Sequence, residues 1–292
     1  MRFYIPALIV LIIISNIKLY SQCACCSAAF SGSALAAGTS NVGVLKEGSI
    51  RAINVYRFLY GNNFYRGIES LDNLYGESLN IHFLGTNIGY GLTKDITVDF
   101  EIGSFPAKNL DYGYTNDKIS GLGVATLIGK WNFFNDRNTK QEATLGIGYR
   151  QPITENLILS GTSGIVAQLF YFLNIHEDVN LILFIRGEKS LENSNNYSQG
   201  DNVVSSIFAS TILADKLAGI LELRYDYLSK AKDDTSDLLN TGRGTFYLVP
   251  QVNYAFDGFS LSTFFELPIH RNYNGVQLGE RFGSGIALIF MI

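Results

Sequence analysis

Charged residues are scarce in this sequence of 292 residues. They make up 16% of the chain, whereas average soluble proteins contain about 25%. Tryptophan occurs once and proline 5 times, while tyrosine, phenylalanine and glycine are frequent, with 17, 20 and 29 residues. Few charges, many aromatic rings, many glycines and a mean hydropathy of +0.14 favour a β protein with much of its surface in a nonpolar medium.

Basic residues are in the minority. The chain has 22 Lys and Arg against 26 Asp and Glu, which gives a net charge of −4. Removal of an N-terminal signal containing Arg2 and Lys18 would leave 20 basic against 26 acidic residues, a net charge of −6. This balance gives no indication of nucleic-acid binding.

Membrane helices and catalytic motifs are missing as well. No segment after the N-terminus approaches the roughly 20 apolar residues of a membrane helix. The three histidines, His82, His176 and His270, lie in no recognisable serine-nucleophile motif, and no phosphate-binding glycine loop has a usable context. We therefore expect that the protein is not an enzyme.

The N-terminus has the pattern of an export signal. Arg2 provides the positive charge, Ala7–Ile14 forms a short apolar run, and Ser15–Gln22 is polar. An apolar run of this length is too short to span a bilayer, so residues 1–22 are predicted to be a cleaved signal peptide. Lipidation of Cys23 is the alternative, although Gln22 is not the small residue that usually precedes a lipidated cysteine.

All three cysteines lie together in the tail that follows, residues 23–47, which is rich in small residues. Cys23, Cys25 and Cys26 provide thiolates, which favour soft metal ions such as Cu(I) or Zn(II). Only three ligands are present, and no histidine lies nearby to complete a tetrahedral zinc site. A metal site and a tail whose thiols oxidise or cross-link after export both remain open.

Residues 48–292 form a series of about 12 strand-like segments, most of which alternate with a period of two. The last segment would leave a bare edge unless it paired with the first, and that pairing would close a barrel. The segments are Gly48–Tyr60, Leu79–Leu92, Asp95–Gly103, Ile119–Phe133, Gln141–Arg150, Gly164–Asn174, Asp178–Arg186, Asn202–Ile212, Lys216–Tyr227, Gly244–Phe256, Phe259–Pro268 and Arg281–Ile292.

The links between these segments alternate between short and long. Short links such as Thr93-Lys94 and Asp257-Gly258 separate long ones such as Ser104–Ser120 and Ile269–Glu280. Outer-membrane barrels have tight periplasmic turns, long external loops and an even strand number. A soluble sandwich has no reason to sort its loops by length in this way. We therefore predict an all-β fold, an antiparallel transmembrane β-barrel.

The alternation also predicts which side chains line the lumen. In Asp95–Gly103, for example, Ile96, Val98 and Phe100 oppose Asp99 and Glu101. Apolar residues facing lipid and polar residues facing a lumen is the barrel pattern. The same parity places His82, Gln168 and Asn253 in the lumen, together with ten charged residues, namely Arg57, Asp99, Glu101, Lys130, Arg150, Arg186, Glu222, Arg224, Asp226 and Glu266.

Two interpretations of these inward charges are open. They line a water-filled pore and select solutes, or they pair across the barrel and leave no open path. A barrel of this size lies between small barrels filled by side chains and wide porins. Within the wall, Pro250 interrupts a strand, and we expect a bulge there.

Three stretches resemble a known family. They are the turn Gly89–Val98, the strand and loop with Asn54–Phe58 and Tyr65–Ser70, and the ending Glu266–Leu278 followed by Arg281 and Gly285. They are similar to segments of outer-membrane barrels grouped as transporters of the MetA-type phenol-degradation pathway. The resemblance implies an outer-membrane channel or transporter for small molecules.

Two features depart from that family. His270-Arg271 stands where Tyr-Gln is usual, and the chain ends Phe290-Met-Ile292 where barrels usually carry a terminal aromatic for insertion. We expect an outer-membrane channel whose partners are the lipid bilayer, the outer-membrane assembly machinery and an unidentified small solute. The alternatives are a metal-handling protein that uses the cysteine cluster, and a structural barrel with an occluded lumen.

Overall fold

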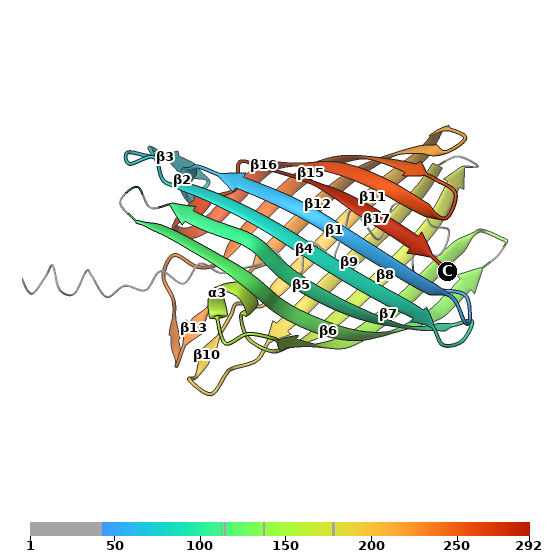
Figure 1. Ribbon diagram of the computed structural model, residues 1–292, viewed down its shortest axis with the longest axis horizontal. Helices are drawn as coiled ribbons and strands as arrows, with labels where there is room; N and C mark the ends of the chain where they lie inside the picture. Colours follow the sequence, from blue (N-terminus) through green and yellow to red (C-terminus); the bar gives the residue numbers. More distant parts are fainter. Residues whose placement is uncertain (1–42, 112, 114, 137, 177–178) are drawn as a thin grey trace, which may run out of the picture.

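The structure, a computed structural model, describes residues 43–292 apart from 112, 114, 137 and 177–178. In this part of the chain, twelve long strands form one closed antiparallel barrel (Figure 1), which confirms the predicted fold class. The strands are β1 (Ile50–Gly61), β4 (Ser78–Gly91), β5 (Ile96–Asp111), β6 (Asn116–Asp136), β7 (Gln141–Pro152), β8 (Gly164–His176), β9 (Val179–Ser190), β11 (Asn202–Ala214), β12 (Leu217–Leu228), β15 (Arg243–Ala255), β16 (Phe259–Gly279) and β17 (Phe282–Met291).

Pairing of the first and last strands closes the barrel. β1 and β17 run antiparallel from Arg51 opposite Met291 to Tyr60 opposite Phe282. β15 pairs with β16, so each of the twelve strands has a neighbour on both sides. Closure removes the free edges that would otherwise expose unpaired N–H and C=O groups.

The two ends of the barrel differ (Figure 1). Tight links lie at one end, the short-turn end, where β1 begins and β17 ends. The small elements lie at the other, the long-loop end. These elements are β2 (Asn63–Gly67), β3 (Glu69–Leu71), α3 (Leu157–Ser160), β10 (Tyr197–Ser198), β13 (Lys232–Asp233) and β14 (Ser236–Asp237). None of the helices described is long and apolar enough to cross a membrane.

Local hydrogen bonds determine where α3 begins and ends. The side chain of Asn156 accepts a hydrogen bond from the N–H of Ile158 at 3.0 Å, which satisfies one of the free amides of the first turn. Gly161 has a φ of +63°, a conformation that glycine adopts at little cost, and it ends the helix.

Two predicted long loops are wrong. Residues 104–120 are mostly strand, because β5 and β6 continue to pair up to Asp111 opposite Asn116, with two register shifts on the way. β16 likewise continues past Pro268 and pairs with β2, Gln277 opposite Tyr65. These extensions contain many polar residues, so a hydrophobicity pattern does not detect them. Backbone pairing with a neighbouring strand stabilises them.

The faces of the strands alternate as the sequence indicates. On β7, Leu145, Ile147 and Tyr149 point outward and are 38%, 61% and 46% exposed, whereas Thr144 and Arg150 are buried. Large apolar side chains are exposed in the same way on the other strands. The outer face is therefore apolar over much of the barrel wall.

Apolar side chains also fill part of the interior. Near the long-loop end, one cluster consists of Leu59, Leu79, Ile81, Phe83, Phe105, Leu110, Val124 and Leu159. This cluster explains why the prediction for His82 is wrong. Ile81 and Phe83 occupy the inward positions of β4, so His82 faces outward, where the Tyr56 hydroxyl lies 2.6 Å from its Nδ1 atom.

The prediction of a bulge at Pro250 is also wrong. Pro250 stays in register with Leu221 of β12. The register shift of β15 against β16 lies instead at Phe246/Tyr247, opposite His270 and Pro268. Proline lacks an N–H donor. At Pro250 the pairing of β15 with β16 is interrupted between Leu248 and Gln251 but resumes in the same register, whereas the register shift lies beside Pro268.

Gly285 should be required for barrel closure. A Cβ at this position would clash with the Phe264 ring and lie 2.5 Å from the Tyr56 carbonyl oxygen. Gly285→Ala is therefore expected to lower the free energy of unfolding by about 1–3 kcal/mol. Urea unfolding in detergent micelles, followed by the fluorescence of Trp131, measures the change.

Gly187→Ala is the matched control, because nothing lies within 4 Å of a Cβ at that strand position. It should leave stability unchanged or raise it by about 0.4–1 kcal/mol. Equal destabilisation by both variants would contradict the packing argument.

Candidate functional site

Ten charged side chains that the alternation assigned to the lumen are all buried. Their exposed fractions range from 0% for Asp99, Glu222 and Arg224 to 8% for Asp226. They come from strands on every side of the barrel, and Gln168 and Asn253 are buried as well. The ten are Arg57, Asp99, Glu101, Lys130, Arg150, Arg186, Glu222, Arg224, Asp226 and Glu266. Nine of them take part in three ion-pair clusters.

The first cluster is centred on Glu266 of β16. One of its oxygens, Oε2, lies 2.7 Å from Arg57 Nη2, and the other, Oε1, lies 3.0 Å from Arg224 Nη1. Arg224 also pairs with Asp226 at 3.1 Å and places its guanidinium 4.6 Å from the centre of the Tyr247 ring. A single carboxylate thus links β1 to β12, with β15, β16 and β17 between them.

The second cluster spans the barrel. Arg186 of β9 donates two hydrogen bonds to the carboxylate of Glu101 on β5, at 2.9 and 3.1 Å. Its Nε atom donates to Glu188 at 2.9 Å, and Arg150 donates to the other oxygen of Glu188 at 2.6 Å. Bidentate pairs of this kind are among the stronger charge-assisted hydrogen bonds.

The third cluster lies nearer the short-turn end. Asp99 forms an ion pair with Lys130, and Arg51 Nη2 lies 3.6 Å from the same oxygen, Oδ2. The Lys130 Nζ atom also lies 5.1 Å from the centre of the Phe170 ring. Separately, Glu222 accepts hydrogen bonds from Ser206 at 2.7 Å and Gln251 at 3.1 Å.

Sequence reasoning missed four buried charges, Arg51, Glu188, Lys108 and Glu280. Arg51 has the same parity as Arg57 on β1, so the signal was present in the sequence. Glu188 has the parity of Arg186 but follows the end of the predicted segment. Lys108 and Glu280 fall in predicted loops, for which strand parity makes no prediction. Lys108 donates to the Ile158 carbonyl of α3 at 3.1 Å.

Buried ion pairs of this kind make removal of one partner costly. Transfer of a charge out of water carries a penalty of several kcal/mol, which a well-placed counter-charge repays. Replacement of one partner by a neutral residue leaves the other buried without compensation, at a cost of about 3–5 kcal/mol. Each cluster therefore links strands that do not pair directly with one another, and the second cluster links β5 to β9 across the barrel.

Part of the chain before β1 lies inside the barrel. Val44 and Leu45 are 8% and 1% exposed, and the N–H of Leu45 donates to Thr97 Oγ1 of β5 at 2.7 Å. The Lys46 carbonyl lies against Gly91 of β4. This segment thus occupies the interior beside β4 and β5 at the short-turn end.

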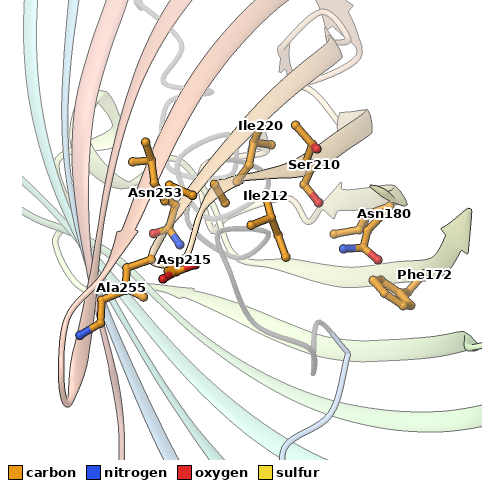
Figure 2. Close-up of a pocket in the computed structure, with 14 residues that line it drawn as sticks. Phe172, Asn180, Ser210, Ile212, Asp215, Ile220, Asn253 and Ala255 are labelled. Atoms are coloured by element: carbon orange, nitrogen blue, oxygen red, sulfur yellow. The ribbon is translucent and has the colours of Figure 1, made fainter. Parts of the chain in front are cut away.

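The other side of that end is hollow. A cavity of about 310 Å³, the short-turn vestibule, opens between β8, β9, β11, β12 and β15. Figure 2 shows Phe172, Asn180, Ser210, Ile212 and Asn253 around it. Its lining mixes apolar side chains with amide and hydroxyl groups, which suits a small amphipathic solute.

At the long-loop end, the carboxylate of Glu280 is buried. This carboxylate accepts hydrogen bonds from the Tyr247 hydroxyl at 2.6 Å and from Arg243 at 2.9 Å. Burial alone would raise the pKa of Glu280, but the guanidinium groups of Arg243 and Arg57 hold the pKa below its usual value. The stabilisation from this group is therefore full above the ordinary carboxylate pKa and is lost as the pH falls through the lowered one.

A polar groove of about 660 Å³ lies at the same end of the barrel. Its lining includes Lys189, Asp201 and Lys230. Lys189 pairs with Asp201 at 2.8 Å, and both side chains are largely exposed, so the pair contributes little to stability.

Neither the signal segment 1–22 nor Cys23, Cys25 and Cys26 fall within the described residues. The predicted cysteine metal site therefore lies outside the described residues. In the residues that are described, no group of three or more His, Cys, Asp and Glu side chains is arranged to hold a metal ion.

Glu266→Gln tests the first cluster. The substitution removes the negative charge that Arg57 and Arg224 share, and we expect a loss of about 3–5 kcal/mol in the free energy of unfolding. Asp257→Asn is the control, because it breaks the exposed 2.8 Å pair with Lys216 and should cost less than about 1 kcal/mol. Urea unfolding in micelles would contradict the bracing role if the two variants lost similar stability.

No protein-family model and no curated protein matches the chain. Among solved structures, the COG4313 outer membrane channel from Pseudomonas putida F1 is similar, with a TM-score of 0.70 and 13% identity over 86% of this chain and 97% of that one. The NanC porin gives a TM-score of 0.48 at 8% identity, covering 82% of this chain and 98% of the porin. The translocator domain of the autotransporter NalP from Neisseria meningitidis gives 0.47 at 10% identity, covering 83% and 88%. The similarity to the COG4313 channel shows that the chain has the barrel fold of an outer-membrane channel.

Proposed function

We propose that the protein is a channel in the outer membrane of a Gram-negative-type bacterium, which passes a small solute and catalyses no reaction. The observation that carries the proposal is the division of the barrel wall between an apolar outer face and an interior that contains charged and amide side chains. A barrel that spans a bilayer needs the first, and a path for polar solutes needs the second.

The distribution of aromatic rings supports a membrane location. Trp131, Phe133 and Phe256 are exposed near the short-turn end, while Tyr227 and Phe246 are exposed nearer the long-loop end. Aromatic side chains at both boundaries between lipid and water are typical of membrane barrels. The N-terminal segment would direct export, the bilayer would surround the wall, and the assembly machinery of the outer membrane would insert it.

Membership of the MetA-type family of phenol-degradation transporters is part of the proposal. The motifs that resemble the family lie at structurally central places. Gly89–Val98 connects β4 to β5, and Gly285 lies in β17 against Phe264 and Tyr56. The name COG4313 outer membrane channel describes a protein with a similar fold, which agrees with a channel function.

A structural barrel with an occluded lumen is the second candidate, and burial of the interior favours it. Arg57, Arg186 and Arg224 expose 2%, 1% and 0% of their surface, and Leu45 lies among the inward side chains. A solute passes this arrangement only if side chains move. The channel and the structural barrel therefore differ in conductance, not in fold.

Planar-bilayer recording separates these two functions. The channel should give discrete current steps smaller than those of the wide porins, because the interior is narrowed by paired side chains. Heat-modifiable gel migration of the same preparation shows that the barrel is folded. Folded protein without current steps would favour the structural barrel, and a mature chain that stays monomeric in solution without detergent would exclude both.

The lipid-facing side of the wall can be tested with Ile147→Arg. Ile147 is 61% exposed near the middle of β7, so an arginine there would face hydrocarbon and should cost about 2–4 kcal/mol of stability in lipid vesicles. Leu239→Arg is the control, because Leu239 is 83% exposed in a loop at the long-loop end and should tolerate the charge. Urea unfolding of both variants in vesicles measures the difference, and equal stabilities would argue against a lipid-facing wall.

A further inference from the structure

The polar groove at the long-loop end is lined by the barrel wall and by the small sheet of β10, β13 and β14. Figure 1 shows β10 and β13 at that end. The barrel contributes Lys189 of β9, Asp201 just before β11 and Tyr227 of β12, and Lys189 and Tyr227 are exposed on the outer face. The small sheet contributes Lys232 of β13 and Asp237 of β14. The groove therefore opens on the outside of the barrel.

The outer face changes from apolar to polar at this groove. Val203 is 37% exposed and lies opposite Gly187 on one side and Tyr227 on the other. Lys189 and Asp201 lie only two residues nearer the long-loop end, a rise of about 7 Å along a strand. Further from that end, the same three strands expose Ile185, Ile207 and Leu223. An aromatic ring between an apolar band and charged side chains marks the boundary between hydrocarbon and lipid headgroups. The groove therefore lies at the level of the headgroups.

The lining offers hydrogen-bond donors and acceptors side by side. Lysines and carboxylates both line the groove, and hydroxyl and amide groups are added by Ser190, Ser198, Gln199 and Ser229. A sugar ring carries several hydroxyls, each of which donates one hydrogen bond and accepts others, so it needs a lining of both kinds. A lysine ammonium also binds phosphate as a compact point charge. The groove thus suits a sugar that carries phosphate better than it suits an apolar molecule.

The ion pairs of the groove can exchange their partners for those of a ligand. Lys189 lies 2.8 Å from Asp201, and Lys230 lies 3.7 Å from Asp237. All four side chains are exposed to solvent, unlike the ion pairs inside the barrel, so each pair contributes little and separates at little cost. A phosphate can then bind the lysine while a sugar hydroxyl donates to the carboxylate.

We infer that this groove binds the phosphorylated sugar headgroup of a glycolipid from the outer leaflet, whose acyl chains lie along the apolar outer face of β9, β11 and β12. The inference rests on the proposed function in one respect, the outer-membrane location with the long-loop end facing outward. The outer leaflet of that membrane is built from phosphorylated glycolipids, so the headgroup at this level carries both sugar and phosphate. An open lumen is not required.

The test uses the full mature protein in micelles of an amine-oxide detergent, which carries no sugar, with purified lipid A as the probe. Phosphatidylglycerol, added at the same concentration of negative charge, is the anionic lipid without a sugar. Lipid A should raise the temperature at which heat-modifiable migration is lost. Phosphatidylglycerol should need a concentration about tenfold higher, or more, for the same effect.

Two variants locate the response in the groove. Ser198→Trp fills the groove with a ring and should raise the half-effective lipid A concentration about tenfold or more. Ser236→Trp is its matched control, because Ser236 is exposed in the same small sheet but does not line the groove.

Lys189→Ala removes one ammonium group and should raise the half-effective concentration about fivefold, the loss expected for one lysine near anionic headgroups. Lys216→Ala is its control, because Lys216 forms an exposed pair of the same 2.8 Å length with Asp257 at the opposite end of the barrel. It should leave the response to lipid A unchanged. If Ser198→Trp does not fold, Lys189→Ala decides the test.

The outcomes separate the groove from the channel. A response to lipid A that the groove variants weaken, without any current in planar bilayers, would support the groove and remove the channel. Current steps together with an absent response to lipid A would overturn the groove and leave the channel standing. An equal response to phosphatidylglycerol would overturn the assignment to a sugar headgroup, and an unchanged response in the folded groove variants would overturn the location.

Discussion

Pairing of β1 with β17 is the constraint on which the other features of the molecule depend. Once those two strands meet, every long strand has hydrogen-bonded neighbours on both sides and the alternation of the sequence becomes an inside and an outside. A slip of one residue at this junction would turn Arg57 outward and Phe58 inward. The register is thus fixed by the cost of exposing charge to an apolar environment as much as by the backbone itself.

Inside the barrel, neutralisation of charge replaces much of the apolar packing that a soluble core would use. Glu266 holds arginines from two distant strands, and Arg186 spans from β9 to Glu101 of β5. Such contacts stabilise only when every partner is present, because each charge was removed from water at a considerable cost.

Much of this fold could be predicted from the sequence, because apolar and polar residues that alternate with a period of two indicate a strand whose two faces meet different environments. Strand ranges, closure and the burial of residues such as Arg57 and Glu222 follow from parity. Prediction failed where another force overrides polarity. His82 faces outward because Ile81 and Phe83 fill an apolar cluster, and the extension of β5 past Ser104 is stabilised by pairing with β6. No local pattern shows that Glu101 and Arg186, 85 residues apart, share a bidentate contact.

The packing of Phe264 against Gly285 has a consequence for how this wall can diverge between related proteins. Phe264 lies between the inward-facing Ser262 and Glu266 of its strand, and the missing side chain of Gly285 leaves the space for its ring. Neither Phe264 nor Gly285 is expected to change alone, because a larger residue at one position requires a smaller residue at the other. Substitutions at these two sites should therefore accumulate in compensating pairs, as a single coupled unit of the barrel.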